Sequence, residues 1–123
     1  MADRASGFLT DTVMGAFEQI KKRLQGKGRS VAIEQSHHEA TIISVHQGKL
    51  ELRYTVRVKA GSQGSYPVVE TSFVDRLSGN EVKTQPEVLG RAAEMSSVTD
   101  VTQQDIVGSF FAHYRPVYEK GYL

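Results

Sequence analysis

The sequence predicts an α+β domain, with N-terminal and C-terminal helices packed on one face of an antiparallel sheet of four to five strands. Three observations support this fold class. Apolar residues recur at helical spacing near both ends of the chain, they alternate with polar residues in between, and only short loops separate the alternating segments. Short loops favour antiparallel hairpins, because parallel neighbours need long crossovers.

The first predicted element is an amphipathic helix near the N-terminus. Its apolar residues fall three or four positions apart and form one face: Leu9, Val13, Ala16, Phe17, Ile20 and Leu24. Ser6 or Thr10 is expected to cap its start, because a side-chain hydroxyl can accept a hydrogen bond from an unpaired backbone N–H. Gly26 and Gly28 are expected to end the helix.

Three strands are predicted next. Segments 31–36 and 41–46 are rich in β-branched residues, and a turn at Gln47 and Gly48 leads into strand 50–58. In strand 50–58 apolar residues alternate with polar ones, which indicates one buried side and one side in water. The polar set is Glu51, Arg53, Thr55, Arg57 and Lys59.

The following strand is predicted over residues 68–75, after a flexible connection at 61–65. Pro67 is expected at its entrance, where the missing N–H disturbs a strand ladder least. A turn should then lead into a short strand, 81–84, which pairs back with residues 73–76.

The C-terminal third is predicted to be helical. Pro86 should begin a short helix that extends to Met95. A final helix is indicated by apolar residues at helical spacing: Ile106, Val107, Phe110, Phe111 and Tyr114. Its candidate N-caps are Thr99, Asp100 and Thr102. Pro116 should end or kink this helix.

The composition is that of an ordinary globular domain. The 123 residues are 39% hydrophobic and 24% charged with a formal net charge of +1, so we expect one domain over residues 1–123 and no overall charge that selects a polyanion. The absence of cysteine excludes disulfides and thiol chemistry. No apolar run approaches the roughly 20 residues that cross a bilayer, and no signal peptide is evident, so we expect a cytoplasmic protein that does not contact a membrane.

Histidines and carboxylates, the ligand types of zinc, gather near residue 40. The cluster consists of Glu34, His37, His38, Glu39 and His46. Adjacent strand residues point to opposite faces, so the His37–His38 pair suits a polar hairpin turn better than a metal site. No motif typical of a nucleophile, a phosphate-binding loop or a metalloprotease is present. We therefore predict no metal and no cofactor, and the missing motifs favour a protein that is not an enzyme without excluding one.

Aromatic residues near the C-terminus suggest protein binding. They fall on two offset helical lines, which is more apolar surface than one small core needs. We predict a non-catalytic binding or assembly protein, a homodimer or a subunit of a larger complex, which self-associates or docks a protein partner through its C-terminal aromatic helix and an exposed sheet edge. The expected contact residues are Phe110, Phe111, Tyr114, Tyr118 and Tyr122.

Two alternative functions remain open. Helices on a curved sheet can enclose a small-ligand or enzymatic pocket, here with Tyr54, Asp75 and His113 near its mouth. The basic segment 21–29 lacks acidic residues and could bind nucleic-acid phosphates, although it carries no aromatic residue to stack on bases. Its cations are Lys21, Lys22, Arg23, Lys27 and Arg29.

Overall fold

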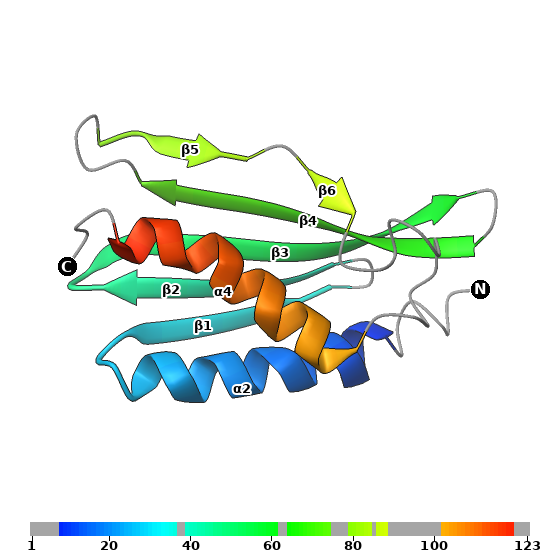
Figure 1. The fold of residues 1–123 in the computed structure, drawn as a ribbon, viewed down its shortest axis with the longest axis horizontal. Helices are drawn as coiled ribbons and strands as arrows, with labels where there is room; N and C mark the ends of the chain where they lie inside the picture. Colours follow the sequence, from blue (N-terminus) through cyan, green and yellow to red (C-terminus); the bar gives the residue numbers. More distant parts are fainter. Residues whose placement is uncertain are drawn as a thin grey trace.

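The computed structural model describes residues 8–36, 39–61, 64–74, 79–84, 86–88 and 102–119. Helical segments lie at both ends of this part of the chain, and strands lie between them (Figure 1). The elements are η1 (Phe8–Val13), α2 (Met14–Gln25), β1 (Ser30–Gln35), β2 (Glu39–His46), β3 (Lys49–Gly61), β4 (Gly64–Val74), β5 (Glu81–Lys83), β6 (Glu87–Val88) and α4 (Gln103–Glu119). The predicted α+β class is confirmed.

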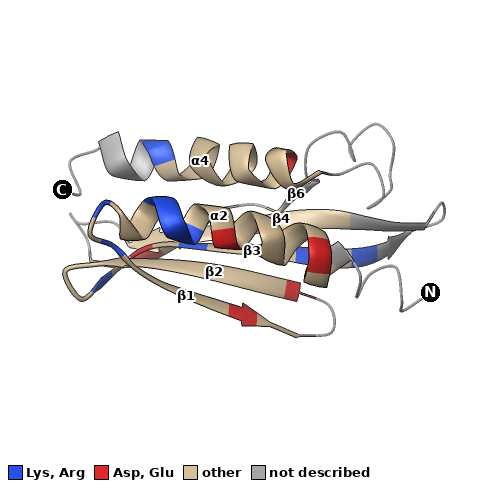
Figure 2. Ribbon diagram, turned by 90° about the horizontal axis from the view of Figure 1, so that it is seen from below, with Lys and Arg blue, Asp and Glu red and all other residues tan. Residues whose placement is uncertain are grey.

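The strands form one antiparallel sheet in the order β1-β2-β3-β4-β5, and β6 also pairs with β4. Each strand of this order lies beside the strand that precedes it in the sequence, as the short connecting loops predict. Helices α2 and α4 both lie on one face of the sheet, and no described helix covers the other face (Figure 2). No helix in the described part is both long enough and apolar enough to span a bilayer.

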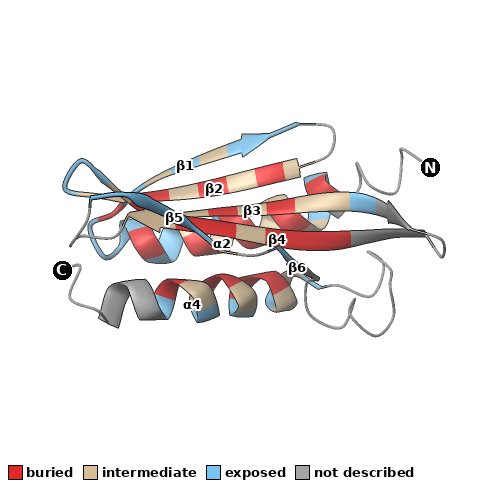
Figure 3. Ribbon diagram, turned by 90° about the horizontal axis from the view of Figure 1, so that it is seen from above, coloured by how far each residue is buried: buried red, intermediate tan, exposed pale blue. Residues whose placement is uncertain are grey.

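The core lies between the two helices and the central strands, where most of the buried residues are found (Figure 3). The apolar face of the first helical segment, from Leu9 to Leu24, is fully buried as predicted. Tyr54 of β3 occupies the centre, with its ring centroid 6.2 Å from that of Phe17 and 5.4 Å from that of Phe110. Both contacts are edge-on, an arrangement that aromatic rings favour.

Two of the predicted turns are confirmed. Gly28, with φ of 82°, follows the end of α2, and the N–H of Arg29 donates to the carbonyl of Leu24 over 3.0 Å. Gln47 and Gly48 both have positive φ, 54° and 77°, and form a two-residue hairpin between β2 and β3. Such a turn matches the twist of the strands it joins.

Of the two predicted helix N-caps that the structure tests, one is confirmed and one is wrong. At the start of α4, Thr102 Oγ1 accepts from the N–H of Asp105, and Asp105 Oδ2 accepts from the N–H of Thr102, which is a reciprocal capping box. The cap at Thr10 was wrong, because Thr10 lies inside η1 and its hydroxyl accepts from Gln35 of β1. Ser6 lies outside the described residues.

Several predictions about the strands need correction. β3 and β4 extend to Gly61 and Gly64, so the connection between them is shorter than predicted. Pro67 lies within β4 opposite Val58, because the ladder continues past the expected start of the strand. The return strand is confirmed, since β5 pairs with residues 72–74.

Two predictions about the C-terminal helices were also wrong where the structure describes them. Glu87 and Val88 form β6, because backbone pairing with β4 outweighs the local preference for a helix, while residues 89–95 lie outside the described part. Helix α4 does not end at Pro116, which was one of the two predicted outcomes, but continues to Glu119; the other outcome, a kink at Pro116, stays a prediction. Phe110 and Tyr114 anchor the preceding turn in the core. This packing offsets the loss of the backbone hydrogen bond that the proline removes.

Candidate functional site

A β-bulge in β3 turns Glu51 into the protein. Ser44 pairs with Leu52 and Val45 pairs with Leu50, so Glu51 is the extra residue between them. Glu51 is only 5% exposed. The prediction that it lies on the wet side of the strand was wrong, because a bulge interrupts the alternation of side chains on which that prediction depends.

The Glu51 carboxylate is held by three side chains from different parts of the fold. Ser44 Oγ and Tyr114 OH each donate to Oε1 over 2.8 Å. Arg29 pairs with Oε2 over 3.3 Å and is itself only 7% exposed. We call these four residues the Glu51 cluster. It joins the turn after α2, the β2–β3 pair and α4, so it stabilises the relative positions of the helices and the sheet.

The environment of the Glu51 cluster shifts two pKa values. Burial by itself would lower the pKa of Arg29, but the hydrogen bond and the negative charge of Glu51 outweigh it, so the pKa rises. Burial raises the pKa of Tyr114 well above its ordinary value, and the hydrogen bond to Glu51 and the Glu51 charge raise it further. Arg29 therefore stays charged and the Tyr114 hydroxyl stays protonated.

The raised pKa of Tyr114 predicts a loss of stability at alkaline pH. A raised pKa means that the folded state keeps a proton which the unfolded chain releases above pH about 10, so the Tyr114 contribution to stability is complete below that pH. Above it, the free energy of unfolding should fall by up to about 1.4 kcal/mol per pH unit relative to Tyr114→Phe. Urea unfolding of both proteins at pH 8–11 measures this difference, and a constant difference would contradict the prediction.

The aromatic residues of α4 divide between core and surface. Phe110 and Tyr114 are buried and their rings stack, so packing within one copy of the protein accounts for most of their burial. Phe111 is half-buried, with its ring edge-on to both. The side chains of Tyr118 and Tyr122 lie outside the described residues. Of the predicted contact residues whose side chains the structure describes, Phe111 is therefore the one that is half-buried rather than buried.

Beside Phe111, between α4 and the turn after α2, lies a hollow of about 520 Å³. We call it the α4 hollow, and its lining residues are Lys27, Gly108, Phe111, Ala112, Tyr114 and Arg115. The guanidinium carbon of Arg23, from α2, lies 5.4 Å from the centroid of the Phe111 ring, within the range of a cation–π contact. The hollow thus combines an aromatic wall, small exposed residues and cations.

Part of the predicted basic segment 21–29 lies near the α4 hollow. Lys22, Arg23 and Lys27 are exposed and Lys21 is half-buried, whereas Arg29 belongs to the Glu51 cluster. Figure 2 shows the basic segments of α2 and α4 at the same end of the helical layer.

The three residues of the predicted pocket are brought together in part. Tyr54 and His113 are neighbours, with ring centroids 6.1 Å apart. Tyr54 is fully buried in the core, and its hydroxyl donates to Ser109 Oγ over 2.8 Å. Asp75 lies outside the described residues.

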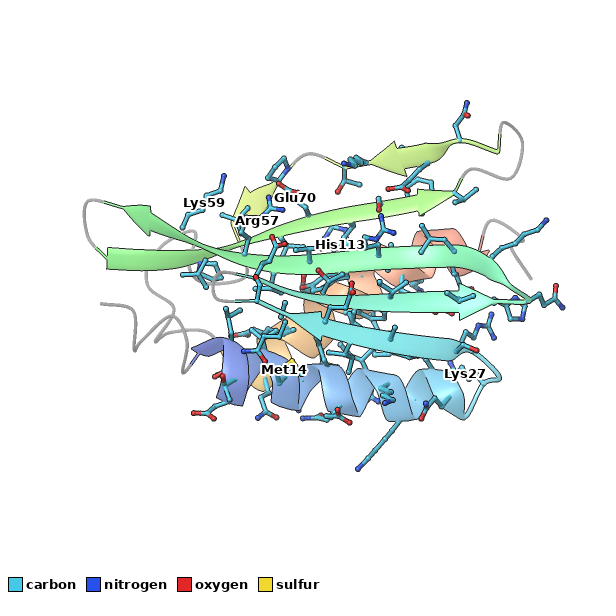
Figure 4. All side chains as sticks on the ribbon, turned by 180° about the vertical axis from the view of Figure 1, so that it is seen from behind. Met14, Lys27, Arg57, Lys59, Glu70 and His113 are labelled. Carbon is cyan, nitrogen blue, oxygen red and sulfur yellow. The ribbon has the colours of Figure 1, made fainter. Side chains whose placement is uncertain are left out.

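The open face of the sheet is polar, and its two strand arginines pair with carboxylates. Arg57 lies next to Glu70 on this face (Figure 4) and donates to both Glu39 and Glu70, over 2.8 and 2.7 Å. These two carboxylates raise the pKa of Arg57, chiefly through the hydrogen bond to Glu39. Arg53 pairs with Glu81 over 3.2 Å. The strand arginines are therefore already engaged by carboxylates.

Metal ligands do not gather in the part of the chain that the structure describes, where no group of three His, Cys, Asp or Glu side chains could hold an ion. His37 and His38 lie outside that part. No family model, curated protein or solved structure matches this chain. Its function must therefore be inferred from the geometry.

Sequence patterns missed both the Glu51 cluster and the α4 hollow. Neither has a local signal, because each joins segments that are far apart in the chain. Tyr114 and Glu51, for example, are 63 positions apart. Lys27 and Arg115 line the same hollow because α4 passes near the turn after α2.

Proposed function

We propose that this protein is a non-catalytic binding protein that docks a protein partner through the α4 hollow. The observation that carries the proposal is the half-buried Phe111 ring in a hollow that also exposes Gly108 and Ala112. Aromatic residues and arginine are enriched where proteins bind one another. The small residues allow a partner to approach the α4 backbone closely.

The chemistry of the α4 hollow favours binding over catalysis. None of the described residues that line it is a histidine, a carboxylate or a serine, the groups that usually transfer protons or attack substrates. The Tyr114 hydroxyl is committed to Glu51 and its pKa is raised, so it is a poor proton donor near neutral pH. A protein segment with an apolar side chain suits this lining.

Selection of a random peptide library against the immobilised protein tests the proposal. We expect enriched peptides whose binding is lost in Phe111→Ser, because that change removes the aromatic wall of the α4 hollow. Val82→Ser is the matched control, since Val82 is the exposed large hydrophobic residue of β5, in another part of the fold. Isothermal titration of the enriched peptides with each variant gives the affinities.

Two outcomes would contradict the proposal. Failure to enrich any peptide would leave the α4 hollow without a docking role. Loss of binding in Val82→Ser with retention in Phe111→Ser would move the docking surface to the β5 edge. Light scattering on the unmodified protein determines whether the partner is a second copy of this chain.

A further inference from the structure

The two outer strands of the sheet, β1 and β5, differ in how well their free edges are protected. β5 has three residues, all of them exposed, and two of the three are charged, Glu81 and Lys83. β1 has six residues, and Glu34 is the charged one among them. Short length and charged side chains are the usual protection of a sheet edge against pairing with another chain. β1 is therefore the edge that is more open to a further strand.

The register of β1 shows which of its backbone groups point away from the sheet. The N–H of Ser36 donates to the carbonyl of Glu39 over 2.8 Å, and β1 and β2 pair without a shift from this turn onward. In an antiparallel pair every second residue bonds to the neighbouring strand, and the residues between them point their N–H and C=O groups outward. Counting from Ser36, the outward set is Gln35, Ile33 and Val31. No other described strand pairs with this outer side of β1.

Helix α2 overhangs the position beside β1. Figure 1 shows α2 alongside β1 on the outer side of the sheet, and Figure 2 shows it in the helical layer. A strand added to β1 would therefore lie beneath α2, as the other strands lie beneath the helices. Three apolar side chains of α2 and β1 are half-buried at the margin of the core: Met14, Val31 and Ile33. Apolar side chains of the added strand can complete their burial.

The same overhang disfavours a second copy of the chain as the occupant. In an antiparallel pair of β1 strands from two copies, the strands would lie about 4.8 Å apart with both α2 helices on the same face. Because α2 lies beyond the edge of β1, the two helix axes would come within roughly 5 Å of each other, whereas packed helices need about 8–10 Å. A single extended segment brings no such helix with it.

Glu34 determines the charge that suits the added strand. Its side chain is exposed and lines the open face of the sheet. Its neighbour on β2 is Thr41, and none of the ion pairs among the described residues involves Glu34. Opposite charges that face each other across neighbouring strands stabilise the pairing. A lysine or arginine in the added strand would give Glu34 such a neighbour.

We propose that the outer side of β1 binds an extended segment of a partner protein as a further strand of the sheet. The segment alternates apolar residues, which face α2, with polar residues that include a lysine or arginine near Glu34. Hydrogen bonds to the outward backbone groups of β1 supply affinity, and the alternating side chains supply selectivity. This site shares no residue with the α4 hollow, so it goes beyond the proposed function and does not depend on it.

Amide hydrogen exchange of the complete protein, followed by NMR, tests the proposal residue by residue. In the free protein the N–H groups of Val31 and Ile33 should exchange faster than those of Ala32 and Glu34, which bond to β2. The probe is a peptide of about six residues in which isoleucine alternates with lysine. At about ten times its dissociation constant it should slow exchange at Val31 and Ile33 by about ten-fold. Protection of these two amides in the free protein, or no change with the peptide, would overturn the proposal.

Backbone methylation distinguishes strand pairing from other modes of binding. Two versions of the peptide carry N-methyl groups on alternate amides, one on the isoleucines and the other on the lysines. An added strand turns only one of these two sets toward β1, so we expect one version to bind at least about ten-fold more weakly than the other. Equal affinities of the two versions would contradict pairing through the backbone.

Charge reversal tests the role of Glu34. A matched peptide has glutamate at every lysine position, and the unmodified protein should prefer the lysine peptide. Glu34→Lys should reduce this preference by about three-fold or more. Glu81→Lys makes the same charge change at the β5 edge and should leave the preference unchanged. Equal reductions in both variants would show a general charge effect and overturn the basic partner.

The remaining outcomes separate this proposal from the proposed function. Phe111→Ser should bind the lysine peptide as tightly as the unmodified protein does. Loss of binding in Phe111→Ser would place the peptide in the α4 hollow, which overturns pairing at β1 and leaves the proposed function intact. A dimer detected by light scattering, with Val31 and Ile33 protected from exchange, would overturn the proposal in favour of a second copy.

Discussion

Replacing Arg29 with methionine is expected to lower the free energy of unfolding by about 3–5 kcal/mol, because it leaves the Glu51 carboxylate buried without its cation. The side chains of this pair are only 5% and 2% exposed, so water cannot replace the guanidinium. Urea unfolding measures the loss. Arg53→Met is the matched control, since the Arg53–Glu81 pair is 43% and 36% exposed and should contribute at most about 1 kcal/mol.

A second substitution tests whether the stability loss in Arg29→Met comes from the unpaired Glu51 charge or from general misfolding. Arg29→Met combined with Glu51→Leu removes both charges, and we expect it to recover most of the lost stability, because apolar replacement of a buried ion pair is often neutral. If the single variant lost no more stability than Arg53→Met, the Glu51 cluster would not have the stabilising role that its geometry indicates.

Replacing Phe110 with alanine is expected to lower the free energy of unfolding by about 3–5 kcal/mol, whereas Phe111→Ala should lose much less. Phe110 is fully buried, and its ring contacts those of Tyr54 and Tyr114, so truncation leaves a cavity beside both. Phe111 is half-buried at the α4 hollow, where water can take the place of the ring. Denaturant unfolding of the two variants gives the comparison.

Adjacent positions on one helix make this comparison direct, because the same ring is removed each time. Equal losses would mean that Phe111 belongs to the core as fully as Phe110 does. The aromatic wall of the α4 hollow would then be a structural feature, and the proposed docking surface would lose its main support.

Local patterns in the sequence were sufficient for the helices and most strands. The apolar face from Leu9 to Leu24 is set by spacing within one element, and the Gln47–Gly48 turn depends on backbone preferences at two positions. Neither needs information about distant parts of the chain. The same is true of the capping box at Thr102.

The errors arose where tertiary structure decides the outcome. Glu51 enters the core because the register between β2 and β3 shifts by one residue at a β-bulge. The alternation of residues within β3 alone does not indicate that shift. Arg29 was grouped with its basic neighbours, although its partner lies 22 positions away. The contrast between Phe110 and Phe111 depends on how α4 is rotated about its own axis, which spacing leaves open when two apolar lines are adjacent.

The placement of α4 has a consequence for how the protein is made. Four residues of this last helix complete the core around Tyr54: Ile106, Val107, Phe110 and Tyr114. During synthesis the strands emerge well before them, with Tyr54 uncovered and Glu51 without one of its donors. A nascent chain on the ribosome therefore leaves part of the apolar face of the sheet uncovered until residues 103–119 have left the exit tunnel, and chaperones can bind this surface during that interval.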